Sequence, residues 1–172
     1  LNLSNKISQV LQNTGLNATS LRLEIPEGAI IDGAESVIEI LRQLRELGVK
    51  LFIDDFGTGY PSLGRLYQFP INGLKIDRSF ISNMRAKKQN LEIVQAIVTL
   101  AHSLGMAVTA EGVETTEQLA LLKALNCEFA QGYLFSKPVE SLAARRLMTN
   151  NLSAGGESIP MPGLLSREPL PN

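Results

Sequence analysis

The sequence predicts an α/β protein of the β/α-barrel type, and three observations lead to this fold class. Short apolar runs with the character of strands alternate with longer segments of helical periodicity, as in parallel sheets covered by helices. Three helical segments end in or near a leucine, a residue that tolerates left-handed backbone follows, and a strand comes next. Acidic residues recur at the ends of the apolar runs, where the strands of a barrel open onto one face. The 172 residues leave room for about six of the eight strand–helix units of a complete barrel.

The elements are expected in a regular order along the chain. Residues 1–4 are expected to end a first strand that runs into a helix around residues 6–11. Further strands are expected at residues 21–23, 50–53, 74–76, 106–110 and 128–131. Helices are expected between them at residues 37–47, 91–104 and 115–125. The residues that end these helices are Gly48, Gly105 and Asn126. Thr115 and Gln118 form a predicted capping box.

Composition limits the class of protein. With 44% hydrophobic and 19% charged residues, the chain has the make-up of a soluble globular domain. Sixteen basic and 17 acidic residues give no basic footprint for a nucleic-acid polymer, but they allow a small anionic ligand held through metal. The sequence contains no apolar run of membrane-spanning length and no signal-peptide pattern. Its one cysteine, Cys127, excludes an intrachain disulfide and is compatible with the reducing, cytoplasmic location that we expect.

The chain is expected to contain one folded part and one tail. Residues 1–148 carry the predicted elements, whereas residues 149–172 are rich in Ser, Gly and Pro and are expected to be flexible. Because the chain starts with Leu1, in what reads as the end of a strand, we expect that the natural beginning lies upstream. That sequence could include a membrane anchor.

Acids at strand ends are the strongest functional signal in the sequence. Glu24, Asp54, Asp55, Asp77 and Glu111 all follow apolar runs. A carboxylate at the end of a buried strand must be solvated, paired or bound to a cation. Oxygen ligands without a cluster of Cys and His favour Mg²⁺ or Mn²⁺. The sequence therefore predicts a metal site at the C-terminal mouth of the barrel.

The adjacent pair of Asp54 and Asp55 indicates a two-metal site. Where the backbone turns at the end of a strand, one carboxylate can bridge two metals while the other binds one. Two metals about 3.5–4 Å apart can clamp a phosphodiester and lower the pKa of a water between them. Lys75 could orient that water or neutralise charge on the transition state. Residues 57–59 (GTG) supply a tightly turning loop.

Each of these residues also has a structural alternative. Asp54 could cap a helix expected near Ser62, and Lys75 could be an ion-pair partner. Glu27 or Glu114 could cap a loop. The alignment of several acids at successive strand ends favours a shared site over these separate explanations.

Three further residues are expected to take no part in the chemistry. Asp77 is more simply explained by a structural role. His102 lies within a predicted helix, far from any strand end, and Cys127 is expected to be a small buried apolar residue.

Four long blocks are more specific than any single acid: Leu51–Gly59 (LFIDDFGTG), Leu74–Phe80 (LKIDRSF), Ala110–Thr115 (AEGVET) and Gln131–Pro138 (QGYLFSKP). In order and spacing they resemble the EAL family of cyclic di-GMP phosphodiesterases. The resemblance covers about residues 1–148. It implies a modified TIM barrel that hydrolyses cyclic di-GMP to linear pGpG with two Mg²⁺ or Mn²⁺ ions.

The resemblance also implies a role for each matching residue. The expected metal ligands are Asn2, Glu24, Asp54, Asp55 and Glu111. Lys75 matches a lysine that contacts the catalytic water, and Gln131 matches a glutamine near the metal-bound water; with Glu111 they are the expected catalytic residues. Glu27 matches a glutamate that steadies the loop after the aspartate pair, and Glu114 matches one that contacts the ligand.

The sequence departs from the family at three places. The Glu-Ala-Leu strand, with its metal ligand and the phosphate-contacting arginine that follows it, does not occur in the chain. Pro26 and Pro61 replace a threonine and a serine of two loops, and each proline removes an N–H and fixes a backbone angle. Only the first departure could abolish activity by itself. We therefore expect an active full protein and an inactive isolated piece.

Other functions stay open on the sequence alone. The main alternative is a catalytically silent receptor that binds cyclic di-GMP. A generic Mg²⁺-dependent barrel for another substrate leaves the Asp-Asp-Phe-Gly-Thr-Gly loop unexplained. A truncated product without function, with its open strand edge covered by a second chain, is a further alternative. The resemblance also implies a homodimer through the loop and helix after Asp55, and sensory or diguanylate cyclase modules upstream.

Overall fold

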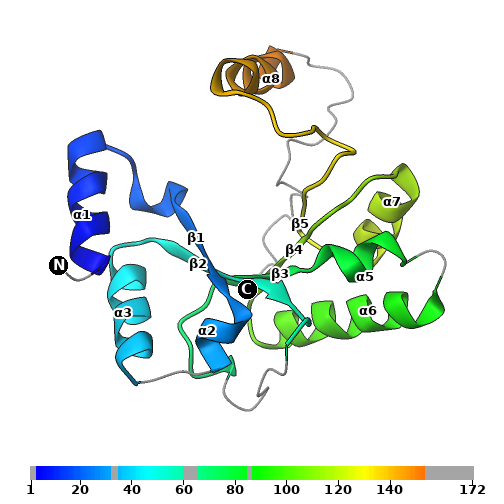
Figure 1. Ribbon diagram of the computed structural model, residues 1–172, viewed down its shortest axis with the longest axis horizontal. Helices are drawn as coiled ribbons and strands as arrows, with labels where there is room; N and C mark the ends of the chain where they lie inside the picture. The colour runs from blue at the N-terminus through cyan, green and yellow to red at the C-terminus, as the bar shows by residue number, and fades with distance from the viewer. Residues whose placement is uncertain (1–2, 32–34, 60–65, 85–86, 154–172) are drawn as a thin grey trace, which may run out of the picture. The chain divides into compact units, whose positions relative to one another are not determined.

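The computed structural model describes residues 3–31, 35–59, 66–84 and 87–153, in which helices alternate with strands (Figure 1). In chain order the elements are α1 (Leu3–Thr14), the 3-10 turn η1 (Ala18–Ser20), β1 (Arg22–Pro26), α2 (Glu27–Ile31), α3 (Glu35–Glu46), β2 (Lys50–Phe56), β3 (Gly73–Ile76), α5 (Arg78–Ser82), α6 (Lys88–Ser103), β4 (Ala107–Ala110), α7 (Thr116–Ala124), β5 (Phe129–Ala130) and α8 (Ser141–Ser153). The described strands form one sheet in the order β1-β2-β3-β4-β5. β1 is parallel to β2, and β4 is parallel to β5. The predicted α/β class and incomplete barrel are confirmed.

The chain divides into two compact units, and the first consists of residues 1–75 and 101–106. Its strands β1 and β2 pair in a register that sets Glu24 beside Phe52 and Pro26 beside Asp54. Residues 51–53 of β2 are all buried, as expected of a parallel strand covered on both faces. Helices α1 and α3 lie side by side (Figure 1), and the Ser4 hydroxyl donates to Gln43 Oε1 at 2.8 Å.

The second unit consists of residues 76–100 and 107–172. Thr109 of β4 pairs with Phe129 of β5 in parallel register. Apolar side chains from three helices form its core beside these strands: Ile81 of α5, Val94, Ile97 and Val98 of α6, and Leu122 of α7. Among the described helices of both units, none is long and apolar enough to cross a membrane.

The predicted helix ends are confirmed. Gly48, Gly105 and Asn126 have φ angles of 93°, 70° and 60°, in the left-handed region that ends a helix. The predicted capping box at α7 is also present. Thr115 Oγ1 accepts from the backbone N–H of Gln118 at 3.2 Å, and Gln118 Oε1 accepts from that of Thr115 at 3.0 Å.

Two expectations about the N-terminal half and the short helices were wrong. Residues 3 and 4 begin helix α1 rather than end a strand, so the described residues form five strands rather than six. Helices α2 and α5 were not predicted, because five residues are too few for a helical period to show.

The predicted boundary between the folded part and the tail, at residue 148, falls within helix α8. Helix α8 runs to Ser153, and its sequence contains neither Gly nor Pro to end it earlier. Residues 154–172 of the predicted tail lie outside the described residues.

Candidate functional site

Strand β2 carries the adjacent acids Asp54 and Asp55. The strand continues to Phe56, so both acids lie within it rather than after it. Asp55 has a φ of 53°, a left-handed conformation that few residues other than Gly, Asn and Asp adopt. This local turn breaks the alternation of side chains along the strand. Asp54 is partly exposed and Asp55 is exposed, so a cation can reach both carboxylates.

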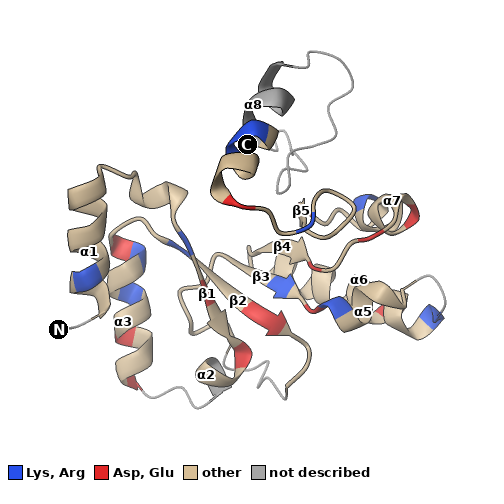
Figure 2. Ribbon diagram, turned by 45° about the horizontal axis from the view of Figure 1, so that its top comes forward, with Lys and Arg blue, Asp and Glu red and all other residues tan. Residues whose placement is uncertain are grey.

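Lys75 of β3 joins two of the predicted metal ligands. The lysine is only 5% exposed, and its Nζ donates to Glu24 Oε2 at 2.6 Å and to Asp54 Oδ1 at 2.9 Å. Figure 2 shows the acidic residues on β1 and β2 and the basic residue on β3. A buried ammonium needs such partners, and bonds between two charged groups are the short, strong kind. The ion-pair alternative for Lys75 is therefore present, with two site residues as partners.

Glu24 and Pro26 lie in the strand rather than in a loop beyond it, contrary to the sequence prediction. β1 runs from Arg22 to Pro26. The proline takes the last position of a strand at the edge of the sheet, where a missing N–H is tolerated.

The loop after the aspartate pair is tied to Glu27, the first residue of α2. The Glu27 side chain is buried, and its Oε2 accepts from the backbone N–H groups of Gly57 at 3.0 Å and Gly59 at 3.3 Å. Its other oxygen, Oε1, is buried and has no hydrogen-bond partner within the described part of the chain. The side chain thus makes the contacts that a loop-steadying glutamate requires.

Glu111 and Gln131 meet at the ends of β4 and β5. The backbone N–H of Glu111 donates to the Ile76 carbonyl at 3.1 Å, and that of Gln131 donates to the Ala110 carbonyl at 2.9 Å. Gln131 Nε2 donates to Glu111 Oε1 at 2.8 Å. The amide therefore orients a predicted metal-binding carboxylate.

Glu114 lies exposed three residues further on, and its backbone is held by the helix cap. Its N–H donates to Gln118 Oε1 at 2.8 Å. The sequence pattern marks Gln118 only as a capping residue. The signal for a wider role is the burial of its side chain, which the capping pattern does not reveal.

Asp77 caps α5, where its Oδ1 accepts from the Ser79 N–H at 3.0 Å. Partial burial raises the pKa of Asp77, but hydrogen bonds from Ser79 and Arg78 and the charge of Arg78 outweigh it and lower the pKa overall. Cys127 is 1% exposed, and burial raises the pKa of its thiol to about 12. His102 lies within α6. The structural explanation therefore holds for Asp77 and Cys127.

Three predicted residues are not placed by the structure. Asn2, Pro61 and Ser62 lie outside the described residues, and with them the expected helix after the aspartate pair.

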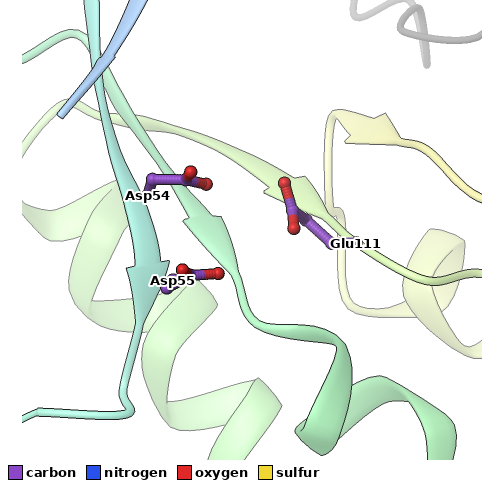
Figure 3. Close-up of side chains that lie close together, drawn as sticks. All are labelled: Asp54, Asp55 and Glu111. Carbon is purple, nitrogen blue, oxygen red and sulfur yellow. The ribbon is translucent and has the colours of Figure 1, made fainter. Parts of the chain in front are cut away.

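Asp54, Asp55 and Glu111 form a carboxylate cluster (Figure 3). One oxygen from each lies within 4.8 Å of the others. Oxygen ligands of this kind suit the hard cations Mg²⁺, Mn²⁺ and Ca²⁺. The cluster therefore fits a divalent metal.

These features define a class of protein: an α/β domain of the incomplete-barrel type with an acidic cluster that can hold a metal. The EAL domain family model matches residues 2–138, and the chain belongs to this family. The resemblance seen in the sequence is thereby confirmed.

Relatives and solved structures add detail. The chain is 46% identical over 146 residues to the cyclic di-GMP phosphodiesterase NbdA of Pseudomonas aeruginosa, and the match covers 85% of this chain and 19% of NbdA. The PaMucR phosphodiesterase in complex with c-di-GMP has a TM-score of 0.79 and 38% identity, over 83% of this chain and 58% of that one. Klebsiella pneumoniae BlrP1 in a manganese and cyclic di-GMP complex has a TM-score of 0.72 and 33% identity, over 78% and 34%. The chain spans about a fifth of NbdA.

Proposed function

We propose that the chain is part of a cyclic di-GMP phosphodiesterase that hydrolyses its substrate to linear pGpG with Mg²⁺ or Mn²⁺. The observation that carries the proposal is the cluster of Asp54, Asp55 and Glu111 in a chain of the EAL family. The name of NbdA and the c-di-GMP bound to PaMucR support the choice of substrate. The manganese bound to BlrP1 supports the metal requirement.

The cluster, Glu24 and the unplaced Asn2 are the residues that would hold the metal. A bound divalent cation polarises the phosphate and makes water more acidic. The protein's own part is to keep the ligand oxygens in place before substrate arrives. Gln131 does so for Glu111, whose carboxylate it contacts directly.

Lys75 has two roles in this proposal. Without metal, its ammonium offsets the repulsion between the carboxylates of Glu24 and Asp54. During turnover the same charge stabilises negative charge that develops on the phosphate and orients the attacking water. Because Lys75 is buried in β3, it supplies this charge from a fixed position.

Three further features belong to the proposal. Glu27 steadies the loop after the aspartate pair, and Glu114 contacts the nucleotide. As the family resemblance implies, the protein forms a homodimer through the loop and helix after Asp55, and sensory or diguanylate cyclase modules can precede it. We also propose a cytoplasmic location, because a lone buried cysteine suits a reducing compartment.

The test is a measurement of cyclic di-GMP binding and of pGpG formation with Mn²⁺ or Mg²⁺. Binding is measured by calorimetry with Ca²⁺, and product by chromatography. Asp54→Asn should abolish product and weaken metal-dependent binding, whereas Asp77→Asn, which changes an acid outside the cluster, should leave both within about twofold. The Glu-Ala-Leu motif is absent from these 172 residues. We therefore expect the chain alone to bind cyclic di-GMP with little turnover. A larger protein that contains both this chain and the motif should turn the substrate over.

The outcomes separate the alternatives. Metal-independent binding without product in either protein would favour the silent receptor. No binding and no product in either protein would overturn the proposal.

Lys75→Met separates metal binding from turnover. Removal of the ammonium leaves two carboxylates for a cation to neutralise, so Mn²⁺ affinity should stay equal or rise. In the larger protein that contains this chain, turnover should fall by roughly 10²–10³, the usual cost of losing a group that stabilises transition-state charge. Calorimetry with Mn²⁺ and the chromatographic assay measure the two effects. Equal loss of affinity and turnover would contradict this role for the lysine.

A further inference from the structure

The side chain of Gln118 is bonded at both ends of its amide inside the protein. It is 6% exposed, and its Oε1 accepts from the N–H groups of Glu114 at 2.8 Å and Thr115 at 3.0 Å. Its Nε2 donates to the Ile81 carbonyl at 3.1 Å in a buried hydrogen bond. The first two bonds belong to the cap of α7. The third does not, because Ile81 lies 37 residues away in α5.

The first residue of α5, Arg78, also lies close to the chain before α7, at Gly112. Gly112 has a φ of 69°, and a Cβ at this position would lie 2.6 Å from Arg78 Cβ. The backbone at Gly112 therefore lies directly against Arg78, the first residue of α5. Ile81 lies almost one turn further along the same helix.

The opposite side of the segment is fixed by backbone bonds. Val113 donates its N–H to the Gln131 carbonyl at 3.0 Å, and its own carbonyl accepts from Leu134 at 3.0 Å. The chain is thus held between α5 and the residues after β5. Gln118 supplies the side-chain connection on the α5 side.

From these contacts we propose that Gln118 is a positioning residue, which holds the Glu111–Thr115 segment against α5 and thereby sets the places of Glu111 and Glu114. A cap alone needs only the bonds from Oε1 to the backbone. Burial of the whole amide costs free energy unless its N–H groups also find acceptors, and the Ile81 carbonyl is one. The roles of the two glutamates rest on the proposed function. The hydrogen bonds by which Gln118 joins the segment to α5 do not depend on that function.

The experiment compares Gln118→Met, Gln118→Glu and Thr115→Val in the full chain. Methionine keeps the length of the side chain and removes all three bonds. Glutamate keeps the two acceptor bonds and removes the donation to Ile81. Valine removes the hydroxyl that accepts from the Gln118 N–H and leaves the bonds of the Gln118 side chain intact. The third variant is therefore a control for the loss of helix capping.

Three quantities are measured for each variant: the melting temperature, the affinity for Mn²⁺ alone, and amide exchange of Glu111–Thr115 by NMR. All three variants should melt earlier than wild type. The two Gln118 variants should lose about tenfold in Mn²⁺ affinity, as is usual when an indirect support of a metal ligand is removed. Their Glu111–Thr115 amides should shift and exchange faster. Thr115→Val should keep the wild-type affinity within about twofold.

Two results would overturn the proposal: an equal loss of affinity in Thr115→Val, or unchanged amide shifts and exchange in Gln118→Glu. Failure of the proposed function looks different. A wild-type chain that binds no Mn²⁺ would refute the metal site, and the amide exchange would then decide by itself whether Gln118 holds the segment.

Discussion

Two acid-bearing segments of the molecule are held by different kinds of buried side chain. The loop after Asp55 is tied by the carboxylate of Glu27, and the segment that begins at Glu111 is tied by the amide of Gln118. One carboxylate oxygen of Glu27 accepts from the backbone N–H groups of both Gly57 and Gly59. The other oxygen is buried without a hydrogen-bond partner among the described residues. Gln118 uses its oxygen and its nitrogen.

The two side chains differ in the strength of their hydrogen bonds and in the cost of burying their polar atoms. A charged acceptor makes stronger bonds to N–H groups than a neutral one, but it carries a larger desolvation cost. A neutral amide makes weaker single bonds and leaves less of its polar surface unpaired. We therefore expect the Glu27 tie to depend on its charge and the Gln118 tie to depend on its exact fit.

The largest expected difference between the two segments lies in the glycines that pack against them. A Cβ on Gly132 would lie 2.2 Å from the Val113 carbonyl oxygen, whereas one on Gly59 would lie 3.1 Å from Glu27 Oε1. Gly132→Ala should therefore lower the free energy of unfolding by about 3 kcal/mol. Gly59→Ala is the matched change in the loop after Asp55, and its free energy of unfolding should stay within about 1 kcal/mol of wild type. Urea unfolding measures both, and equal effects would contradict the difference in fit.

The Glu27 tie can be broken directly. Glu27→Ala leaves the N–H groups of Gly57 and Gly59 without their acceptor, which should cost about 2 kcal/mol. Amide exchange at Gly57 should rise by tenfold or more. Glu27→Gln retains an acceptor of the same shape and should lie between wild type and Glu27→Ala. Wild-type exchange at Gly57 in the alanine variant would show that the loop is held by other contacts.

The smallest effect is expected at Asp77, which caps the helix that Gln118 contacts. Asp77→Ala should cost about 1 kcal/mol at neutral pH, and Asp77→Asn should cost less because Asn also caps. The folded-state pKa of Asp77 is lowered below 3.8, so its contribution is present above that pH. It is lost as the pH falls through the folded pKa. The gap between wild type and Asp77→Ala should therefore close below about pH 4, and urea unfolding across this range tests it.

Several local features could be predicted because they depend on neighbours in the sequence. The stops at Gly48 and Gly105 reflect the backbone freedom of glycine, and the capping box joins residues three apart. The α/β class followed from periodicity, and the acids at strand ends led to the cluster of Asp54 and its partners. The predicted ends of β1 and β2 are too early, because an acid inside a strand interrupts the apolar run in the same way as the end of a strand does.

The alternation of strands and helices, the helix ends and the family could all be predicted from the sequence, since they depend on local chemistry and on long matching blocks. Which polar groups meet could be seen only in the folded chain. Lys75 bonds Glu24 across 51 residues, and Gln118 bonds Ile81 across 37. Such partners depend on how separate elements pack and on which groups become buried together, and no period or spacing in the sequence records that.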